Sequence, residues 1–471
     1  MTVELQDRVE SRMRDLGITG AEVTSLTALT GGASRQMWKV TTRAPGEWGR
    51  VILRMDHPSD PDPGANAQEA QVLGAAHAAG VPSPAVLDHS SDPDVLGTPY
   101  VILSFVDGET IARKILRDDR FATARTRLGA DLGRAAGLIT RVDVEGLDLP
   151  VVDDAIAKLM ENYRDSGIHR PALLLGLTEL ARSRPDPAPR RTLVHGDMRM
   201  GNLMVDEDGL AAVLDWEITH LGDPYEDLGY VCMRAWRFGG PGRVAGAGDV
   251  EEFLAAYEEV TGFRPTEEQL TWWEARATAW WGIGCLRQMQ RSVPGHSNEL
   301  ELLAIGRRTA EQEYDLLELL YPDVEPAEFV PTGHPQSPAS GATLFTDPTA
   351  ATLVAGLESY LDVDLVRGTG EPNRFKARIA KNVVSLIGRE IDQGPAADAW
   401  YAGRLSELGV EDEDGLAGLV AGLSDTSPNA PETRSLVAVL KTAARLRLAV
   451  SNPRYVLAPV PRSTAGAAVA Q

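Results

Sequence analysis

The first hundred residues alternate short apolar runs with glycine turns. The stretch SLTALTGGASRQMWKVTTR at 25–43 has the pattern of a strand, a glycine turn and a second strand. GRVILRM at 49–55 predicts a third strand, and PYVILSFVDG at 99–108 predicts a buried strand that ends in a turn. AQEAQVLGAAHAAG at 67–80 has the apolar spacing of a helix that ends at its last glycine. Together these elements predict a small twisted sheet with one helix.

Helical patterns dominate the rest of the chain. Residues 108–330 are expected to be mostly helical, although the apolar runs LMV and LAAVLDW flank DEDG, whose Asp-Gly ending is typical of a tight hairpin. Residues 331–345 are rich in Pro, Gly and Ser and read as a linker. Only helical patterns follow at 346–460, and the tail at 461–471 is expected to be disordered. The predicted fold class is therefore α+β, followed by an all-α C-terminal domain.

Composition narrows the function classes. With 471 residues the chain is too long for a single core. No run approaches the ~20 apolar residues that span a bilayer, and the charged start has no apolar signal core. Two cysteines, Cys232 and Cys285, provide no disulfide framework, which suits the cytoplasm. A net charge of −22 argues against a nucleic-acid binder. The expected partner is a small molecule, and neither nucleic acid nor membrane is expected.

One stretch, LVHGDMRMGNLMVDEDGLAAVLDWE at 193–217, carries the candidate chemistry. Its hairpin returns Asp215 to the neighbourhood of Asp197 and Asn202. Phosphoryl transfer needs a carboxylate that orients the attacking hydroxyl, and oxygen ligands for Mg²⁺, a hard ion. These three residues supply such oxygens in order. The alternative is a surface hairpin with solvated acidic turns.

HGDMRMGN followed by LDWE resembles the catalytic loop and metal segment of the aminoglycoside phosphotransferase and choline kinase-like family, which has a protein-kinase-like fold. The resemblance covers roughly residues 20–330, with an N-lobe at 1–107 and a C-lobe at 108–330. It implies ATP and Mg²⁺ as cofactors, Asp197 as the catalytic base, and Asn202 and Asp215 as metal ligands.

Two further residues have supporting roles in this resemblance. His195 would brace the loop, and a direct chemical role is the alternative. Asp227, in GDPYEDLGYV, resembles the aspartate that buttresses the loop, although a helix N-terminal charge would also explain it.

The upstream parts of such a kinase have counterparts in the expected order. TGGASRQMW resembles the glycine-rich loop over the ATP phosphates, where Gly31 and Gly32 let backbone amides approach closely and Ser34 adds a hydroxyl. A plain turn is the alternative. In LSFVDG, which resembles the hinge between the lobes, the Ser104 carbonyl and the Val106 amide would bind the adenine edge.

One position departs from the family. Its phosphate-binding lysine falls in the strand VILRM, where this chain has Arg54. Arginine keeps the charge and can pair with Glu69, the matching helix glutamate, but its planar fork does not replace a point charge. A pseudokinase scaffold that binds a nucleotide therefore remains an alternative.

Arg199, inside the loop HGDMRMGN, indicates which class of molecule accepts the phosphoryl group. A cation beside the base is unfavourable for a polycationic aminoglycoside. GGASRQMW and HGDMRMGN resemble the branch that includes kinase-like domains fused to acyl-CoA dehydrogenases. That branch implies a hydroxyacyl-CoA, whose phosphate or carbonyl groups Arg199 could meet. A surface ion pair, an aminoglycoside-type kinase and a choline-type kinase are the alternatives, and the net negative charge opposes an anionic acceptor.

The C-terminal part resembles an uncharacterised helical module that accompanies such kinases. TRSLVAVLKTAARLRLAVSNPRY predicts an amphipathic helix that carries Lys441, Arg445 and Arg447. Its basic face is either solvated or a docking surface for the acidic kinase part or for an anionic ligand.

Overall fold

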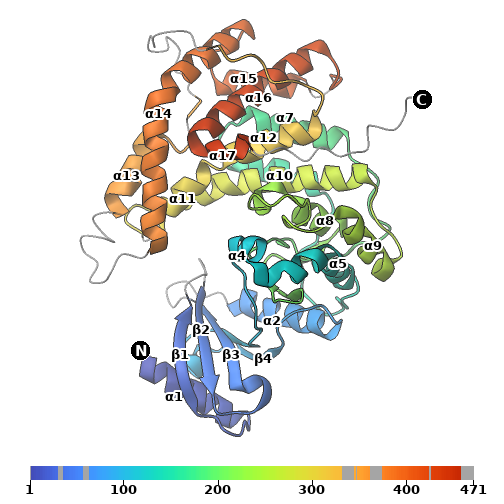
Figure 1. Cartoon of the computed structure of the whole chain (residues 1–471), viewed down its shortest axis with the longest axis vertical. Coiled ribbons are helices and arrows are strands. Elements are labelled where there is room, and N and C mark those ends of the chain that lie inside the picture. Colours follow the sequence, from blue (N-terminus) through green and yellow to red (C-terminus); the bar gives the residue numbers. More distant parts are fainter. Residues whose placement is uncertain are drawn as a thin grey trace. The chain divides into compact units, whose positions relative to one another are not determined.

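The fold is described from a computed structural model of the chain, which describes residues 2–29, 35–56, 63–296, 298–330, 344–345, 347–360, 374–423 and 426–457. It divides into two compact units (Figure 1). The first unit comprises 1–153, 187–232 and 236–266, and the second comprises 154–186, 233–235 and 267–471. Each unit is described by itself.

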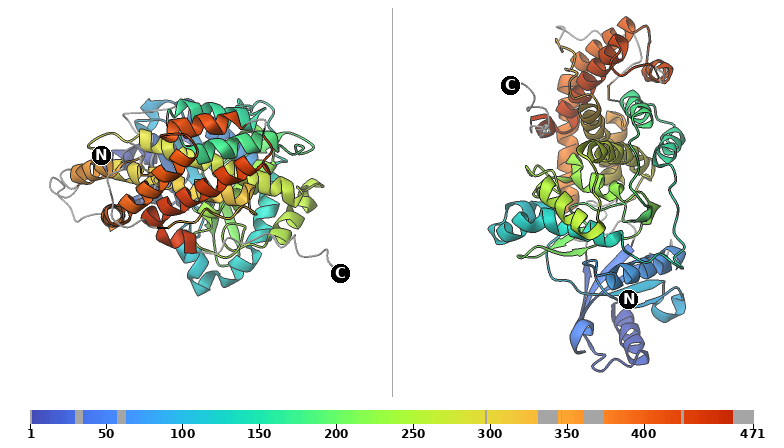
Figure 2. Two further views of the ribbon diagram at one scale, coloured as in Figure 1. Left: turned by 90° about the horizontal axis from the view of Figure 1, so that it is seen from above. Right: turned by 90° about the vertical axis from the view of Figure 1, so that its right-hand side faces the viewer.

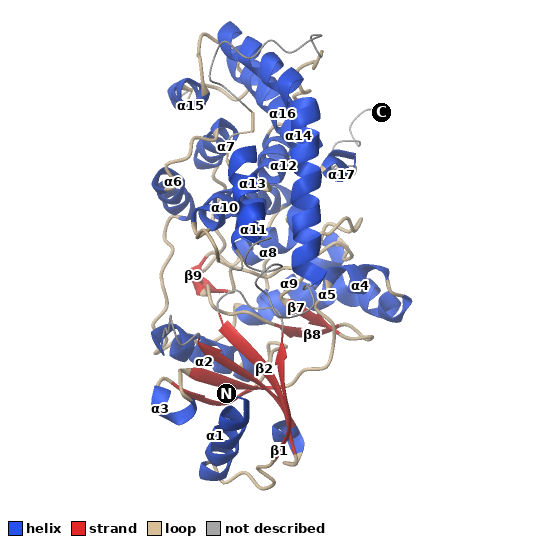
Figure 3. Ribbon diagram, turned by 90° about the vertical axis from the view of Figure 1, so that its left-hand side faces the viewer, coloured by secondary structure: helices blue, strands red, loops and turns tan. Residues whose placement is uncertain are grey.

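The first unit contains an antiparallel five-stranded sheet near its N-terminal end (Figure 3). Its strands run in the order β1–β2–β3–β5–β4, and their bounds are β1 Val23–Leu29, β2 Arg35–Thr42, β3 Arg50–Asp56, β4 Val86–Ser90 and β5 Tyr100–Ser104. Every residue of β5 is buried, as its unbroken apolar run predicts. The strands predicted in this region and the helix α2 (Pro63–Ala78) are confirmed.

One face of this sheet is covered by elements that the apolar pattern did not reveal. Helix α1 (Thr2–Asp15) and the short α3 (Pro93–Leu96) pack on it through Val9, Met13 and Leu96, which share a core with Leu53 and Ile102. The register of β2 against β3 sets the positions of two arginines. Met37 lies opposite Arg54, and Arg35 lies opposite Asp56. Side chains two residues apart on a strand share a face, so Arg35 and Arg54 lie on the same face.

The remainder of the first unit is helical, with one small hairpin and one further pair of short strands. It contains α4 (Ala112–Arg117), α5 (Ala122–Ile139), α8 (Tyr225–Cys232), α9 (Val250–Thr261) and the strand pairs β6 (Thr192–Val194) with β9 (His220–Gly222) and β7 (Leu203–Val205) with β8 (Leu210–Val213). Helices α5 and α9 approach closely because α5 carries glycines at the contact. A Cβ at Gly133 would lie 2.0 Å from the Phe253 carbonyl oxygen. The hairpin around DEDG is confirmed, and Asp206 closes its turn by accepting from the Gly209 amide at 2.9 Å.

The second unit is entirely helical in its described part (Figures 1 and 2). Its helices are α6 (Ala155–Asp165), α7 (Pro171–Arg182), α10 (Glu267–Gln290), α11 (Glu299–Gly306), α12 (Thr309–Leu320), α13 (Ala350–Tyr360), α14 (Arg374–Glu407), α15 (Glu413–Gly422), α16 (Pro431–Ser451) and α17 (Pro453–Leu457). Helices α7 and α10 to α16 share one apolar core, and Tyr455 of α17 packs on a smaller cluster of α12 and α16 residues. Leu344 and Phe345, at the end of the predicted linker, are buried in that core.

The predicted fold class, a mixed α/β part followed by an all-helical part, is confirmed. No helix among the described residues combines the length and the apolar content that a membrane crossing requires. Gly31, Gly32 and Ser34, with the tail at 461–471, lie outside the residues that the structure describes.

Candidate active site

The loop at 195–202 is fixed from behind by Asp227, in the first turn of α8. Its Oδ2 accepts from the His195 amide and its Oδ1 from the Gly196 amide, both at 2.8 Å. Burial raises the pKa of Asp227 to about 6, and the two amide hydrogen bonds work against that rise. Gly196 has φ of 83°, a backbone conformation that favours glycine. The carboxylate therefore sets the direction in which the chain enters the loop.

His195 uses both of its ring nitrogens within the fold. Nδ1 accepts from the Asp197 amide at 3.1 Å, so Nε2 carries the proton and donates to the Leu214 carbonyl oxygen at 3.1 Å. The ring meets Trp216 edge-on, with 4.7 Å between ring centroids. Burial lowers the pKa of His195 and keeps the imidazole neutral. A ring that is held in this way braces the loop and has no nitrogen left for proton transfer.

The Asp197 carboxylate accepts three hydrogen bonds from neighbouring side chains. Oδ1 accepts from Arg199 Nε at 2.9 Å and from the Tyr230 hydroxyl at 2.8 Å. Oδ2 accepts from Asn202 Nδ2 at 2.6 Å. These donors from the loop and from α8 fix the orientation of the carboxylate.

Sequence reasoning missed Tyr230. It is buried on α8, three residues after Asp227, and residues three apart share one face of a helix. One helix face therefore presents a carboxylate to the loop backbone and a hydroxyl to the Asp197 side chain. This i, i+3 spacing was the available signal in DLGY.

Arg199 lies at the border of this cluster. Besides its bond to Asp197, its guanidinium stacks over the Trp236 ring at 4.4 Å from the centroid. The side chain is 24% exposed, so it can reach a molecule outside the protein. Its expected role as a substrate ligand stays a prediction, and in this structure it is paired with the base.

Asp215 follows the hairpin, and the Leu214 amide donates to the Asn202 carbonyl oxygen at 2.8 Å. Asp215 has φ of 67°, which is unusual for an aspartate and holds the residue in one orientation. Its pKa is raised to about 6 by burial and by the nearby Glu217, while Arg54 acts in the opposite direction. A cation bound beside this carboxylate would stabilise its charged form.

The oxygen donors of the site fit Mg²⁺. Asn202 directs its amide nitrogen to Asp197, so its Oδ1 is the atom that could face a metal ion. Mg²⁺ is commonly held by one or two carboxylates together with waters and substrate phosphates, so Asp215 and Asn202 form a sufficient protein set. The described residues contain no group of three or more His, Cys, Asp or Glu arranged to hold a metal ion.

Arg54 and Glu69 pair as the sequence suggested. Arg54 Nη1 donates to Glu69 Oε1 at 2.6 Å and Nη2 donates to Oε2 at 3.1 Å. Arg35, which the sequence reasoning missed, contacts the same carboxylate and also lies 3.5 Å from Asp56. Burial alone would raise the pKa of Glu69, but the two guanidinium groups outweigh it and the pKa lies below its ordinary value. Two arginines thus share the Glu69 carboxylate.

The expected hinge follows β5. The Ser104 hydroxyl accepts from the Ala85 amide at 2.8 Å, so the side chain is used inside the sheet. Val106 is half-buried and lies just beyond the strand. The adenine contacts of Ser104 and Val106 remain predictions about their backbone atoms.

The charged residues of the candidate site form one electrostatic cluster within the first unit. Charges on Arg54, Asp197 and Glu69 all influence the pKa of Asp215. The sheet arginine, the catalytic loop and the residue after the hairpin are therefore near one another. They combine a held carboxylate, oxygen donors for a metal and cations for phosphates.

Two parts of the chain match known family models. Residues 25–273 match a model described as the phosphotransferase enzyme family, and residues 368–455 match a domain of unknown function. The curated mouse protein "Acyl-CoA dehydrogenase family member 10" is 28% identical over 197 residues, which are 39% of this chain and 18% of the relative. The rat protein "Acyl-CoA dehydrogenase family member 11" is 26% identical over 198 residues, 39% of this chain and 25% of the relative. The chain thus spans no more than a quarter of these relatives.

A crystal structure of a Ralstonia eutropha protein, assigned provisionally as an aminoglycoside phosphotransferase, shares the fold. Its TM-score is 0.54 with 24% identity, and the match covers 67% of this chain and 97% of that one. The kinase-like fold and the resemblance to the branch linked to acyl-CoA dehydrogenases are confirmed. Because the family model matches more than half of the 471 residues, the chain belongs to the phosphotransferase enzyme family.

Proposed function

We propose that this phosphotransferase uses ATP and Mg²⁺ to phosphorylate a hydroxyl group of a small molecule. The observation that carries the proposal is the orientation of the Asp197 carboxylate. It accepts hydrogen bonds from Arg199, Asn202 and Tyr230, and Asp215 is close enough to sense its charge. In the reaction, the acceptor hydroxyl gives its proton to Asp197 and its oxygen attacks the γ-phosphorus. The bond from that phosphorus to the ADP oxygen breaks, so ADP leaves with the electron pair. Bound Mg²⁺ would neutralise the phosphate charge that develops.

The hydrogen bonds suggest which Asp197 atom accepts the proton. A carboxylate oxygen has two lone pairs, and Oδ1 uses both for Arg199 and Tyr230. Within the described part of the chain, Oδ2 accepts its side-chain hydrogen bond from Asn202 and keeps a second acceptor position. We therefore assign proton acceptance to Oδ2. A hydroxyl placed there would also be close to the oxygen donors proposed for the metal.

The nucleotide phosphates would be bound by Arg54, which Glu69 orients. A guanidinium can contact two phosphate oxygens at once through its fork. Arg35 adds a second cation to the same carboxylate, so the negative charge of a polyphosphate would meet two arginines. This arrangement supports a working nucleotide site in place of a pseudokinase. The expected backbone contacts of Ser104 and Val106 would hold the base.

For the acceptor we propose a hydroxyacyl thioester, such as a 4-hydroxyacyl-CoA. Arg199 is partly exposed beside Asp197, and its Nη groups could meet an anionic or carbonyl group of the acceptor while its Nε stays on Asp197. The names of the partial relatives, both acyl-CoA dehydrogenase family members, support the same class. Aminoglycoside and choline-type amines remain the competing acceptors, and the net charge of −22 favours cationic ones.

A direct test is an ATP-consumption screen of the pure protein against hydroxyacyl-CoAs, aminoglycosides and choline-like amines, with product phosphorus followed by NMR. The proposal expects acceptor-dependent ADP formation and a phosphomonoester on the hydroxyacyl chain. Turnover of amines alone would replace the acceptor while keeping the kinase. Nucleotide binding without any acceptor-dependent turnover would favour the scaffold.

A further inference from the structure

The C-terminal segment, defined here as residues 344–457, shares its core with helices that lie within the predicted C-lobe. Leu175 of α7 and Leu317 of α12 belong to the same buried cluster as Leu436 and Leu440 of α16. Trp400 of α14 donates from its indole nitrogen to the Glu328 carbonyl oxygen at 3.0 Å. The buried apolar residues of the segment, as far as the structure describes them, therefore form a core together with α7 and α12.

The ion pairs between α12 and α16 join acids of α12 to bases of α16. Lys441, 1% exposed, donates to the Tyr321 carbonyl oxygen at 2.7 Å and lies 3.0 Å from Glu318. The sequence left open whether the basic face of α16 is solvated. For Lys441 and Arg447 the solvated alternative is wrong, because both are buried against carboxylates, whereas Arg445 is exposed.

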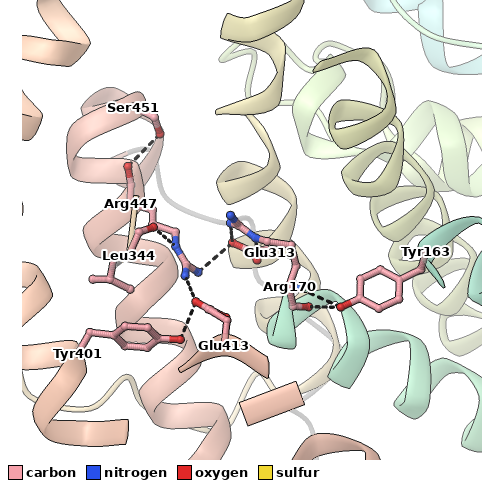
Figure 4. A network of polar contacts seen from close by, with 8 residues as sticks. All are labelled: Tyr163, Arg170, Glu313, Leu344, Tyr401, Glu413, Arg447 and Ser451. Carbon is pink, nitrogen blue, oxygen red and sulfur yellow. Dashed lines mark hydrogen bonds and ion pairs between the residues drawn. The ribbon is translucent and has the colours of Figure 1, made fainter. Parts of the chain in front are cut away.

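Glu313 of α12 is the centre of this contact (Figure 4). It accepts from Arg170 Nε at 2.8 Å and Nη2 at 2.5 Å, and it lies 3.3 Å from Arg447 Nη1. Arg447 also donates from Nη2 to Glu413 at 2.6 Å and from Nε to the Leu344 carbonyl oxygen at 2.7 Å. The Tyr401 hydroxyl donates to the same Glu413 oxygen at 2.8 Å. Burial would raise the pKa of Glu313, but Arg170 and Arg447 outweigh it and keep the carboxylate charged.

Each side of this network is neutral by itself. Arg170 and Glu313 form an ion pair outside the segment, and Arg447 and Glu413 form a second pair inside it. The Arg447–Glu313 contact joins these two complete pairs, whereas Arg307–Glu390 and Lys441–Glu318 are ion pairs that span the two sides. A buried charge without its partner is costly, so spanning pairs make the two sides specific for each other.

We propose that the C-terminal segment is a docking module whose partner is the α7–α12 surface of a phosphotransferase, and that the Arg447–Glu313 contact is its recognition element. The module needs no covalent link to bind, so it would also bind as a separate polypeptide. This assigns a binding role to the domain of unknown function at 368–455 and is independent of the acceptor proposed above. An anionic small molecule is the less favoured partner, since carboxylates of the chain already meet Lys441 and Arg447.

The test begins with the full chain, into which a specific protease site is inserted within 331–343. The chain is purified folded, cleaved and passed over a sizing column at low salt and in 1 M NaCl. We expect the two pieces to co-elute one-to-one in both, because buried pairs are screened little by salt. Separation of the pieces on cleavage would overturn the proposal.

Two matched variants then test the recognition element by the rate at which a labelled C-terminal piece exchanges. Arg447→Met removes the buried contact to Glu313 and should speed dissociation by about thirtyfold or more. Arg434→Met is the control, because Arg434 makes a 2.7 Å ion pair to Asp323 from the same helix, but Asp323 is 69% exposed. The control should change the rate by less than about fivefold.

Equal rates for the two variants would contradict the role of Arg447. If Arg447→Met does not fold as a full chain, Lys441→Met is measured under the same criterion. That variant breaks the second buried contact, to Glu318 and the Tyr321 carbonyl oxygen.

Discussion

The Tyr230 hydroxyl donates to Oδ1 of Asp197 at 2.8 Å, from the same helix face whose Asp227 carboxylate holds the loop backbone. This contact links α8 directly to the proposed base. Together with Arg199 it occupies Oδ1, so the carboxylate can turn only its other oxygen to an acceptor.

Tyr230→Phe is predicted to lower kcat. The variant removes one of the hydrogen bonds that orient the Asp197 carboxylate, so kcat should fall by about tenfold. The KM for ATP should stay the same. Tyr225→Phe is the control, since Tyr225 lies on the same helix but meets Phe263. Equal kcat values for wild type and Tyr230→Phe would remove this positioning role.

Asp215 should make Mg·ATP binding depend on pH. Its pKa of about 6 is above the ordinary value, so the ionised fraction falls as the pH drops through 6. Because only the ionised carboxylate binds the metal, calorimetry should find affinity falling by about tenfold per pH unit below that point. Asp215→Asn should bind weakly at every pH, without this step. Equal affinity of variant and wild type at pH 7.5 would exclude Asp215 as a metal ligand.

Arg54 is predicted to be the main phosphate anchor. Arg54→Ala should reduce kcat/KM for ATP by roughly tenfold to a hundredfold, the effect of losing a charge-assisted bond. Arg54→Lys should keep part of the activity, because a single positive charge still reaches the phosphates. Arg43→Ala, which breaks an exposed pair with Glu22, serves as control. Normal turnover by Arg54→Ala would mean that Arg35 or another group binds the phosphates.

Arg199 is predicted to act on the acceptor side. Arg199→Ala should raise the acceptor KM or lower kcat while the KM for ATP changes little. Arg199→Lys should recover part of the loss, since the charge remains although the stack on Trp236 is weakened. Steady-state kinetics with 4-hydroxyacyl-CoA measures both constants. An unchanged acceptor KM and kcat in the alanine variant would contradict the substrate role of Arg199.

The loop at 195–202 and the sheet could be predicted because their signals are local. Asp197 and Asn202 come shortly before one hairpin and Asp215 directly follows it, and β5 is an unbroken apolar run. Arg35 was missed because its link to Glu69 depends on the register of β2 against β3, which a single sequence does not fix.

The C-terminal surface illustrates a different limit. The basic residues of α16 were visible in the sequence, but Glu313 lies 134 positions before Arg447. Helical periodicity predicts that a helix has a basic face, but it does not identify the residues that this face contacts. The pairing of two neutral ion pairs could be recognised only once the helices were placed in space.

The central claim is that Asp197 accepts the acceptor proton while ATP is bound elsewhere in the site. The most direct measurement compares wild type with Asp197→Ala in two assays, ADP formation with the acceptor found in the screen and calorimetric binding of Mg·ATP. The account predicts that turnover falls by about a hundredfold or more, the usual contribution of a general base, while ATP affinity is nearly unchanged. Turnover equal to that of wild type would contradict the account.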